Sequence, residues 1–158
     1  MRISEKVAEF PPHLPSADHH IKIPDGIYVS DYVGAIGFFY LGRSPRVAMC
    51  FRIVDDVGSE RHIIGYYRTL SLTKNGAPLE KDKRTRNPDF QIGWRSRLAR
   101  DLGKLFAEIS SSNLPRRIPT IDRSVRIKTA TVREDKDGVD RPESFWSSKI
   151  DHILGWAE

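Results

Sequence analysis

The side chains of this chain best suited to chemistry are its arginines and lysines, which gather in two stretches. Residues 81 to 104 hold eight of them against three acidic residues, and residues 116 to 133 hold six against Asp122 alone. A guanidinium offers a planar fork of donors and stays charged at any working pH, so arginine-rich clusters suit contact with phosphate groups. The alternative is that both stretches form an ordinary solvated surface. The net charge is only +5, so the prediction of phosphate contacts depends on the clustering of the basic residues rather than on their total number.

The sequence contains no motif of a known catalytic or cofactor site. It has no Walker loop, dinucleotide glycine pattern, His-Glu-x-x-His, Gly-x-Ser-x-Gly or paired Cys-x-x-Cys. The one cysteine, Cys50, stands in the apolar run VAMCF without a nearby His or acid to activate it. The adjacent His19 and His20 lack the spacing of metal ligands. We therefore expect that the protein is not an enzyme and that it binds no metal and no cofactor. The enzymatic alternative is a nuclease whose carboxylates are dispersed along the sequence.

Composition and length predict one globular domain preceded by an arm. The chain is 39% hydrophobic and 30% charged, and no apolar run approaches the roughly 18 residues of a membrane span. The opening MRISEKVAEF is charged where a secretory signal would be apolar, so we expect a cytoplasmic protein without membrane association. Residues 1 to 22 are proline-rich and lack periodicity, which predicts a flexible N-terminal arm; residues 23 to 158 form the domain.

Alternating residues predict three strands in the first half of the domain. A turn at residues 23 to 26 opens the first strand, and residues 46 to 56 and 61 to 73 form the second and third. The stretch from about 74 to 90 is expected to be a long exposed loop. In the first strand we expect an aliphatic face of Ile27, Val29 and Val33, and an opposite face of Tyr28, Ser30 and Tyr32. In the second, Val47, Met49, Phe51 and Ile53 alternate with Arg46, Ala48, Cys50 and Arg52.

A helix and two further strands follow. Apolar residues recur at three- and four-residue steps from Trp94 to Ile109, which predicts an amphipathic helix with a basic outer face. Residues 124 to 132 alternate as a fourth strand, and residues 134 to 138 form a hairpin tip. The fifth strand runs from about 143 to 156, although IDHILGW also fits a short terminal helix.

The resulting order, β-β-β-α-β-β, is the order of an OB-fold. We therefore predict a mainly β (α+β) domain built on a five-stranded OB-like barrel, with one amphipathic helix between strands three and four. Such barrels often hold single-stranded nucleic acid, using cations along the phosphates and flat side chains under the bases. The aromatic run from Phe38 to Tyr40 is either core or a stacking platform.

Nine residues are predicted to form the nucleic-acid site. The mouth of an OB-fold is formed by the face of strands two and three and by two loops between strands. A shift of one residue in the register would exchange the two faces of a strand. The predicted basic contacts and aromatic stacking residues are Arg43, Arg46, Arg52, Tyr66, Arg68, Arg126, Lys128, Tyr32 and Phe39.

Three short segments resemble one family. Residues 23 to 28 (IPDGIY), 51 to 54 (FRIV) and 92 to 96 (IGWRS) are similar to small uncharacterised proteins of phages and integrative elements. The resemblance covers residues 23 to 156 and implies an OB-like fold of the single-stranded-DNA-binding type. It identifies no binding residue by position.

These observations together predict a partner. We expect a single-stranded DNA-binding protein of a mobile genetic element, acting in replication, recombination or transfer with little sequence preference; RNA and duplex DNA remain alternative ligands. The alternative function is a protein-interaction module that docks on or inhibits a host or element-encoded complex, since OB-folds also bind proteins.

Overall fold

The computed structural model describes residues 23 to 54, 57 to 132 and 147 to 157. Within them the chain is mainly β, as predicted, with one short helix. Five long strands form the main antiparallel sheet in the order β3-β2-β1-β8-β9, and the short β6 pairs with β1. The strands of this sheet are β1 (Ile27–Tyr40), β2 (Ser44–Val54), β3 (Glu60–Arg68), β6 (Thr85–Arg86), β8 (Val125–Val132) and β9 (Ser147–Trp156).

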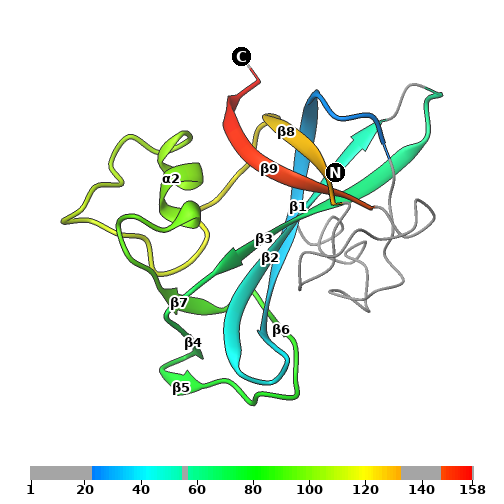
Figure 1. Cartoon of the computed structure of the whole chain (residues 1–158). Helices are drawn as coiled ribbons and strands as arrows, with labels where there is room; N and C mark the ends of the chain where they lie inside the picture. Colours follow the sequence, from blue (N-terminus) through cyan, green and yellow to red (C-terminus); the bar gives the residue numbers. More distant parts are fainter. Residues whose placement is uncertain (1–22, 55–56, 133–146, 158) are drawn as a thin grey trace.

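The remaining elements lie between β3 and β8 in the chain. A small second sheet has the order β5-β4-β7, and the helix α2 (Arg97–Gly103) comes after it. Figure 1 shows α2 to one side of the main sheet and the small sheet below it. The strands of the small sheet are β4 (Ser71–Lys74), β5 (Ala77–Pro78) and β7 (Asp89–Gln91).

The predicted order of the long strands and the helix is confirmed, but the described sheets are not closed into a barrel. β3 and β9 lie at the two ends of the main sheet and share no ladder of backbone hydrogen bonds. The two strands are nevertheless close, because a Cβ atom on Gly65 would lie 3.3 Å from the Cβ atom of Ile150.

Residues 74 to 90 are mostly exposed, as predicted, but they also contain short strands that the prediction of a loop missed. Asn75 and Gly76 have φ values of 52° and 81°, and their turn joins β4 to β5. Two left-handed residues at the centre of a hairpin match the right-handed twist of its strands. The chain then adds β6 to the edge of β1 and buries Phe90 in the core.

The third predicted strand, at residues 61 to 73, is divided into two strands, β3 and β4. β3 ends at Arg68, where the amide of Thr69 donates to Pro45 O at 3.1 Å and that of Leu70 donates to Gln91 O at 2.7 Å. These bonds draw the chain out of the main sheet, so residues 71 to 74 pair with β7 instead.

The helix is shorter than its apolar pattern predicted. Ser96 caps its N-terminus, and the Ser96 hydroxyl accepts from the amide of Ala99 at 3.1 Å. The helix ends at Gly103, and the buried Leu105 and Ile109 reach the core from the turns that follow. Trp94 lies before the helix and is 46% exposed, so it is not part of the apolar stripe.

The end of the chain is a strand. Residues 147 to 156 pair with β8, so the alternative of a terminal helix is wrong. The predicted arm at residues 1 to 22, the hairpin tip at 134 to 138 and residues 143 to 146 lie outside the described residues.

The predicted faces are confirmed in β2 and reversed at the start of β1. Val47, Met49, Phe51 and Ile53 belong to the main core, as expected. Ile27 and Val29 are 64% and 59% exposed, while Tyr28 and Tyr32 pack against that core. Val33 lies on the same side as Ile27 and Val29 but is buried there. The pairing of β1 with β2 shifts between Tyr32 and Gly34, and this irregularity brings Ile36 onto the same side as Val33.

Both sides of the main sheet therefore carry buried apolar residues. The main core lies on the inner face, with α2 packed on it. A second cluster lies on the outer face and consists of Val33, Ile36, Phe38, Ala48, Cys50 and Ile64. In the ranges that the structure describes, α2 is too short and too polar to cross a membrane, and no other helix is long and apolar enough to do so.

Candidate nucleic-acid interface

Arg46 and Arg68 lie directly opposite each other on β2 and β3. They are partners in the antiparallel register and belong to the outer face of the sheet. Arg46 is half-buried and its guanidinium lies 4.4 Å from the centre of the Tyr40 ring. Burial, and next the charge of Arg68, lower the pKa of Arg46, and Tyr40 partly opposes this. Because Arg46 and Arg68 are register partners on neighbouring strands, two like charges lie side by side on this face.

No described carboxylate neutralises these charges. Among residues 23 to 54, 57 to 132 and 147 to 157, no ion pair is made by Arg46, Arg68, Arg84 or Arg43, which is exposed in the turn between β1 and β2. Like charges on directly opposite residues destabilise a sheet by about 0.2 to 1 kcal/mol. The arrangement is therefore a cost to the fold unless an anion neutralises it.

Aromatic rings lie among these arginines. Tyr66 on β3 is half-buried, and its ring meets that of Phe38 edge-on at a centroid distance of 6.4 Å. Burial raises the pKa of Tyr66 to about 12, with Cys50 adding to the rise and the nearby Arg84 opposing it. The phenol is thus a neutral, flat surface at any physiological pH. We call the set Tyr40, Arg43, Arg46, Tyr66, Arg68 and Arg84 the basic-aromatic cluster.

Three other predicted residues share the outer face but not this cluster. Arg126 and Lys128 are exposed on β8, beside Val29 and Ile27 of β1. Arg52 lies toward the other end of β2 and makes a 3.7 Å ion pair with Asp31. The second apolar cluster, which includes Cys50 and Ala48, occupies β2 between Arg46 and Arg52.

The two remaining predicted residues face the core. Tyr32 packs its ring against Phe51 at a centroid distance of 5.5 Å, and Phe39 also packs against the main core. Burial raises the pKa of Tyr32. Neither ring lies on the face that carries Arg46 and Arg68.

Two members of the cluster, Tyr40 and Arg84, were not among the nine predicted residues. Tyr40 ends the aromatic run that fitted either core or a platform, and the cation–π contact with Arg46 places it on the outer face. Arg84 belongs to the first basic stretch, and it lies between β5 and β6, within the residues that were expected to be loop.

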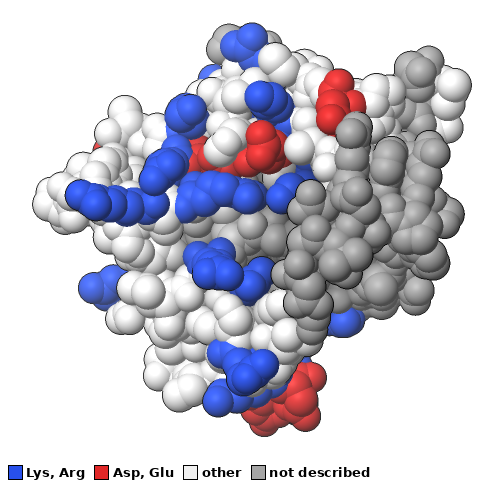
Figure 2. All heavy atoms as spheres, viewed as in Figure 1, with Lys and Arg blue, Asp and Glu red and all other residues white. Residues whose placement is uncertain are grey.

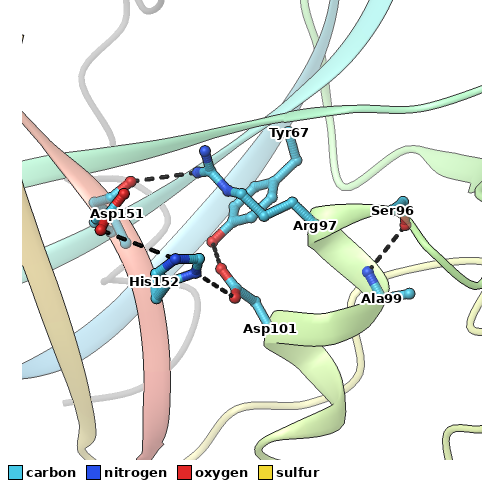
Figure 3. A network of polar contacts seen from close by, with 8 residues as sticks. Tyr67, Ser96, Arg97, Ala99, Asp101, Asp151 and His152 are labelled. Carbon is cyan, nitrogen blue, oxygen red and sulfur yellow. Dashed lines mark hydrogen bonds and ion pairs between the residues drawn. The ribbon is translucent and has the colours of Figure 1, made fainter.

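A separate polar network connects α2 to β3 and β9 (Figure 3). The Tyr67 hydroxyl donates to Asp101 Oδ2 at 2.6 Å, and His152 Nδ1 lies 3.4 Å from Asp101 Oδ1. The Arg97 guanidinium stacks 4.6 Å from the centre of the Tyr67 ring and donates to Ile150 O at 3.3 Å. Tyr67 and Asp101 are each 1% exposed. We interpret this network as a structural connection between elements.

The wider surface is rich in positive charge. In the view of Figure 2, many Lys and Arg side chains are spread over the region of α2 and below it, with some acidic side chains among them. From α2 and the segments next to it, the exposed basic residues are Arg95, Arg100, Lys104, Arg116, Arg117 and Arg123. Only Arg117 of these forms a described ion pair, with Asp89 at 2.8 Å.

Comparison with family models, with curated proteins and with solved structures found no match to this chain.

Proposed function

We propose that this protein binds single-stranded DNA on the outer face of its main sheet, with little sequence preference, during replication, recombination or transfer of a mobile element. The basic-aromatic cluster is the proposed contact surface, and Arg126 and Lys128 extend it along the phosphates. The same proposal treats β1, β2, β3, β8 and β9 as an open five-stranded OB-like barrel. Its support is the strand order and the position of α2 between the third and fourth long strands.

The observation that carries the proposal is the pair of opposed guanidiniums. Arg46 and Arg68 are like-charged register partners, and no carboxylate of the described residues forms an ion pair with either. A phosphate bound between them would accept from both forks and remove the repulsion.

The aromatic residues favour a single strand over a duplex. Tyr40 and Tyr66 flank the arginines on the outer face, and unpaired bases stack on such rings without regard to sequence. Bases inside a duplex are already stacked on their neighbours. Phosphates and base faces occur in DNA and RNA alike, so the test includes both.

The test is a titration of a labelled thymidine oligonucleotide at two salt concentrations. We expect tight binding at low salt and a log-log slope of roughly −0.7 for each phosphate neutralised. A matched duplex should bind more weakly, and a uridine oligonucleotide measures the preference for DNA. Absence of binding to either single strand at low salt would overturn the proposal and favour the alternative of a protein-docking module.

Charge-neutral variants locate the site. Arg46→Gln and Arg68→Gln should each weaken binding by about 10-fold or less and reduce the salt slope, because each removes one phosphate contact. Arg68→Gln should not lower the melting temperature, since it relieves the like-charge pairing with Arg46. Arg117→Gln is the matched control, because Asp89 already neutralises its charge. An equal loss in all three variants would show that the cluster is not the site.

A further inference from the structure

A small pocket lies at the junction of β1, β8 and β9, away from the basic-aromatic cluster. Its volume is about 280 Å³, and it is lined by Asp31, residues 122 to 124, Trp156 and Ala157. Small-molecule pockets usually measure about 300 to 1,000 Å³, so this one suits a group no larger than a single nucleoside. The amide of Ala157 donates to Ser124 O at 2.9 Å, which joins the two segments that form the pocket.

The indole of Trp156 is held rigidly in this pocket. Its Nε1–H donates to Leu105 O at 2.9 Å, and the Phe106 ring meets it edge-on at a centroid distance of 5.7 Å. The guanidinium of Arg123 lies 4.3 Å from the ring centre. The indole therefore already holds a flat, delocalised group, and an aromatic base has the same shape.

Two carboxylates, of Asp31 and Asp122, lie on the polar rim of the pocket. Asp31 is occupied, because Ser124 donates to its Oδ1 at 2.8 Å and Arg52 lies 3.7 Å from its Oδ2. Asp122 is exposed, and its side chain makes no hydrogen bond or ion pair with any residue of the described ranges. A free carboxylate beside an aromatic ring suits a base edge that carries two adjacent N–H donors, and guanine has such an edge.

We infer that this pocket binds a single guanine base, which stacks on Trp156 and donates to Asp122. The base takes the place of Arg123 on the indole, and the released guanidinium becomes available to the phosphate of the same nucleotide. This site is separate from Arg46 and Arg68 and does not depend on the proposed binding of long single strands.

The test uses GMP and the indole N–H signals in two-dimensional ¹⁵N–¹H NMR spectra of the full chain. Trp156→Phe assigns the Trp156 signal by its disappearance. We expect millimolar GMP to shift that signal and to leave the signal of Trp94 in place, and we expect UMP to bind more weakly. The absence of a Trp156 shift with GMP would overturn the inference. Tighter binding of arginine methyl ester than of GMP would also overturn it and would assign the pocket to an arginine of a protein partner.

Two variants examine the two contacts separately. Trp156→Leu should weaken GMP binding by about fivefold or more, the lower end of what base stacking on an aromatic ring contributes. Asp122→Asn, at an exposed position that should not disturb folding, should weaken it by about 10-fold. Trp94→Leu is the matched control and should change nothing. The inference fails if Asp122→Asn binds GMP as tightly as the unchanged protein. The Arg46→Gln variant should keep GMP binding, which separates this site from the oligonucleotide site.

Discussion

The hydrogen bond between Tyr67 and Asp101 is the best-defined polar contact of the core. It joins β3 to α2 at 2.6 Å, and both side chains are almost completely buried. A buried carboxylate that loses a donor keeps the cost of its desolvation, so the cost of deletion exceeds the net contribution of an average hydrogen bond.

We expect Tyr67→Phe to lower the free energy of unfolding by about 1.5 to 3 kcal/mol, because the donor to a buried charged group is removed. The control is Tyr28→Phe, which deletes an exposed 2.6 Å bond to Pro24 O and should cost less than about 1 kcal/mol. Urea unfolding curves measure both variants. Equal losses of unfolding free energy in the two variants would mean that the buried bond to Asp101 stabilises the fold no more than the exposed bond to Pro24 O does.

The sequence predicted correctly which side chains of β2 face the core, but it did not predict this for β1. In β2 the arginines mark the outer face, because a charged side chain is rarely placed in a core. In β1 both sets of alternating residues are apolar enough to be buried, so periodicity alone did not show which set faces inward. The prediction therefore placed Ile27 and Val29 in the core, where the structure exposes them. It also placed Tyr32 and Phe39 at the binding surface, where the structure packs them against the core.

At the scale of elements, the approach of β3 to β9 depends on Gly65. A Cβ atom there would lie 3.0 Å from Cε2 of Tyr67 and 3.3 Å from the Cβ atom of Ile150. Tyr67 cannot easily move aside, because its hydroxyl is bonded to Asp101 and Arg97 covers its ring.

We expect Gly65→Ala to destabilise the protein by about 1 to 3 kcal/mol, as overpacking does in other cores. Gly103→Ala is the matched control, because it lies at the end of α2 with nothing within 4 Å of its Cβ position. That change should instead stabilise the fold by up to about 1 kcal/mol through helix propensity. Thermal unfolding of the two variants should therefore shift in opposite directions; a shared direction would contradict the proposed close contact of β3 and β9.

The elements that the sequence predicted less well are those decided by tertiary contacts. The apolar spacing from residue 94 to 109 is helical, yet Gly103 ends the helix and the later apolar residues reach the core from turns. Residues 74 to 90 carry few apolar side chains, and their short strands depend on pairing with β1 and with one another. No local pattern encodes a two-residue strand.

At the scale of the whole molecule, the main sheet buries ionisable groups on both of its faces. Burial raises the pKa of Cys50 and Tyr66 on the outer side and of Tyr32 and Tyr67 on the inner side. Each group is neutral in the fold at a pH where it would ionise in the unfolded chain. Unfolding at alkaline pH therefore releases protons, and stability falls as pH rises.

We expect the free energy of unfolding to decline as the pH passes about 9, the ordinary pKa of cysteine, and to fall faster above pH 10, where unfolded tyrosines also ionise. The stability that Tyr66 contributes is lost between pH 10, its ordinary pKa, and about pH 12, its raised pKa in the fold. Each such group contributes up to about 1.4 kcal/mol per pH unit within its window. Tyr66→Phe should therefore flatten the decline between pH 10 and 12 in urea unfolding curves.

Ile64→Val is the control for that comparison, because it removes a methyl group from the same buried cluster and keeps both Tyr66 and the Phe38 ring that packs on it. It should lower stability at every pH and leave the slope between pH 10 and 12 unchanged. Stability that stays constant from pH 9 to 12 would contradict the burial of these groups. An unaltered slope in Tyr66→Phe would show that Tyr66 is open to solvent, and the outer face would then offer a fully exposed ring beside Arg46 and Arg68.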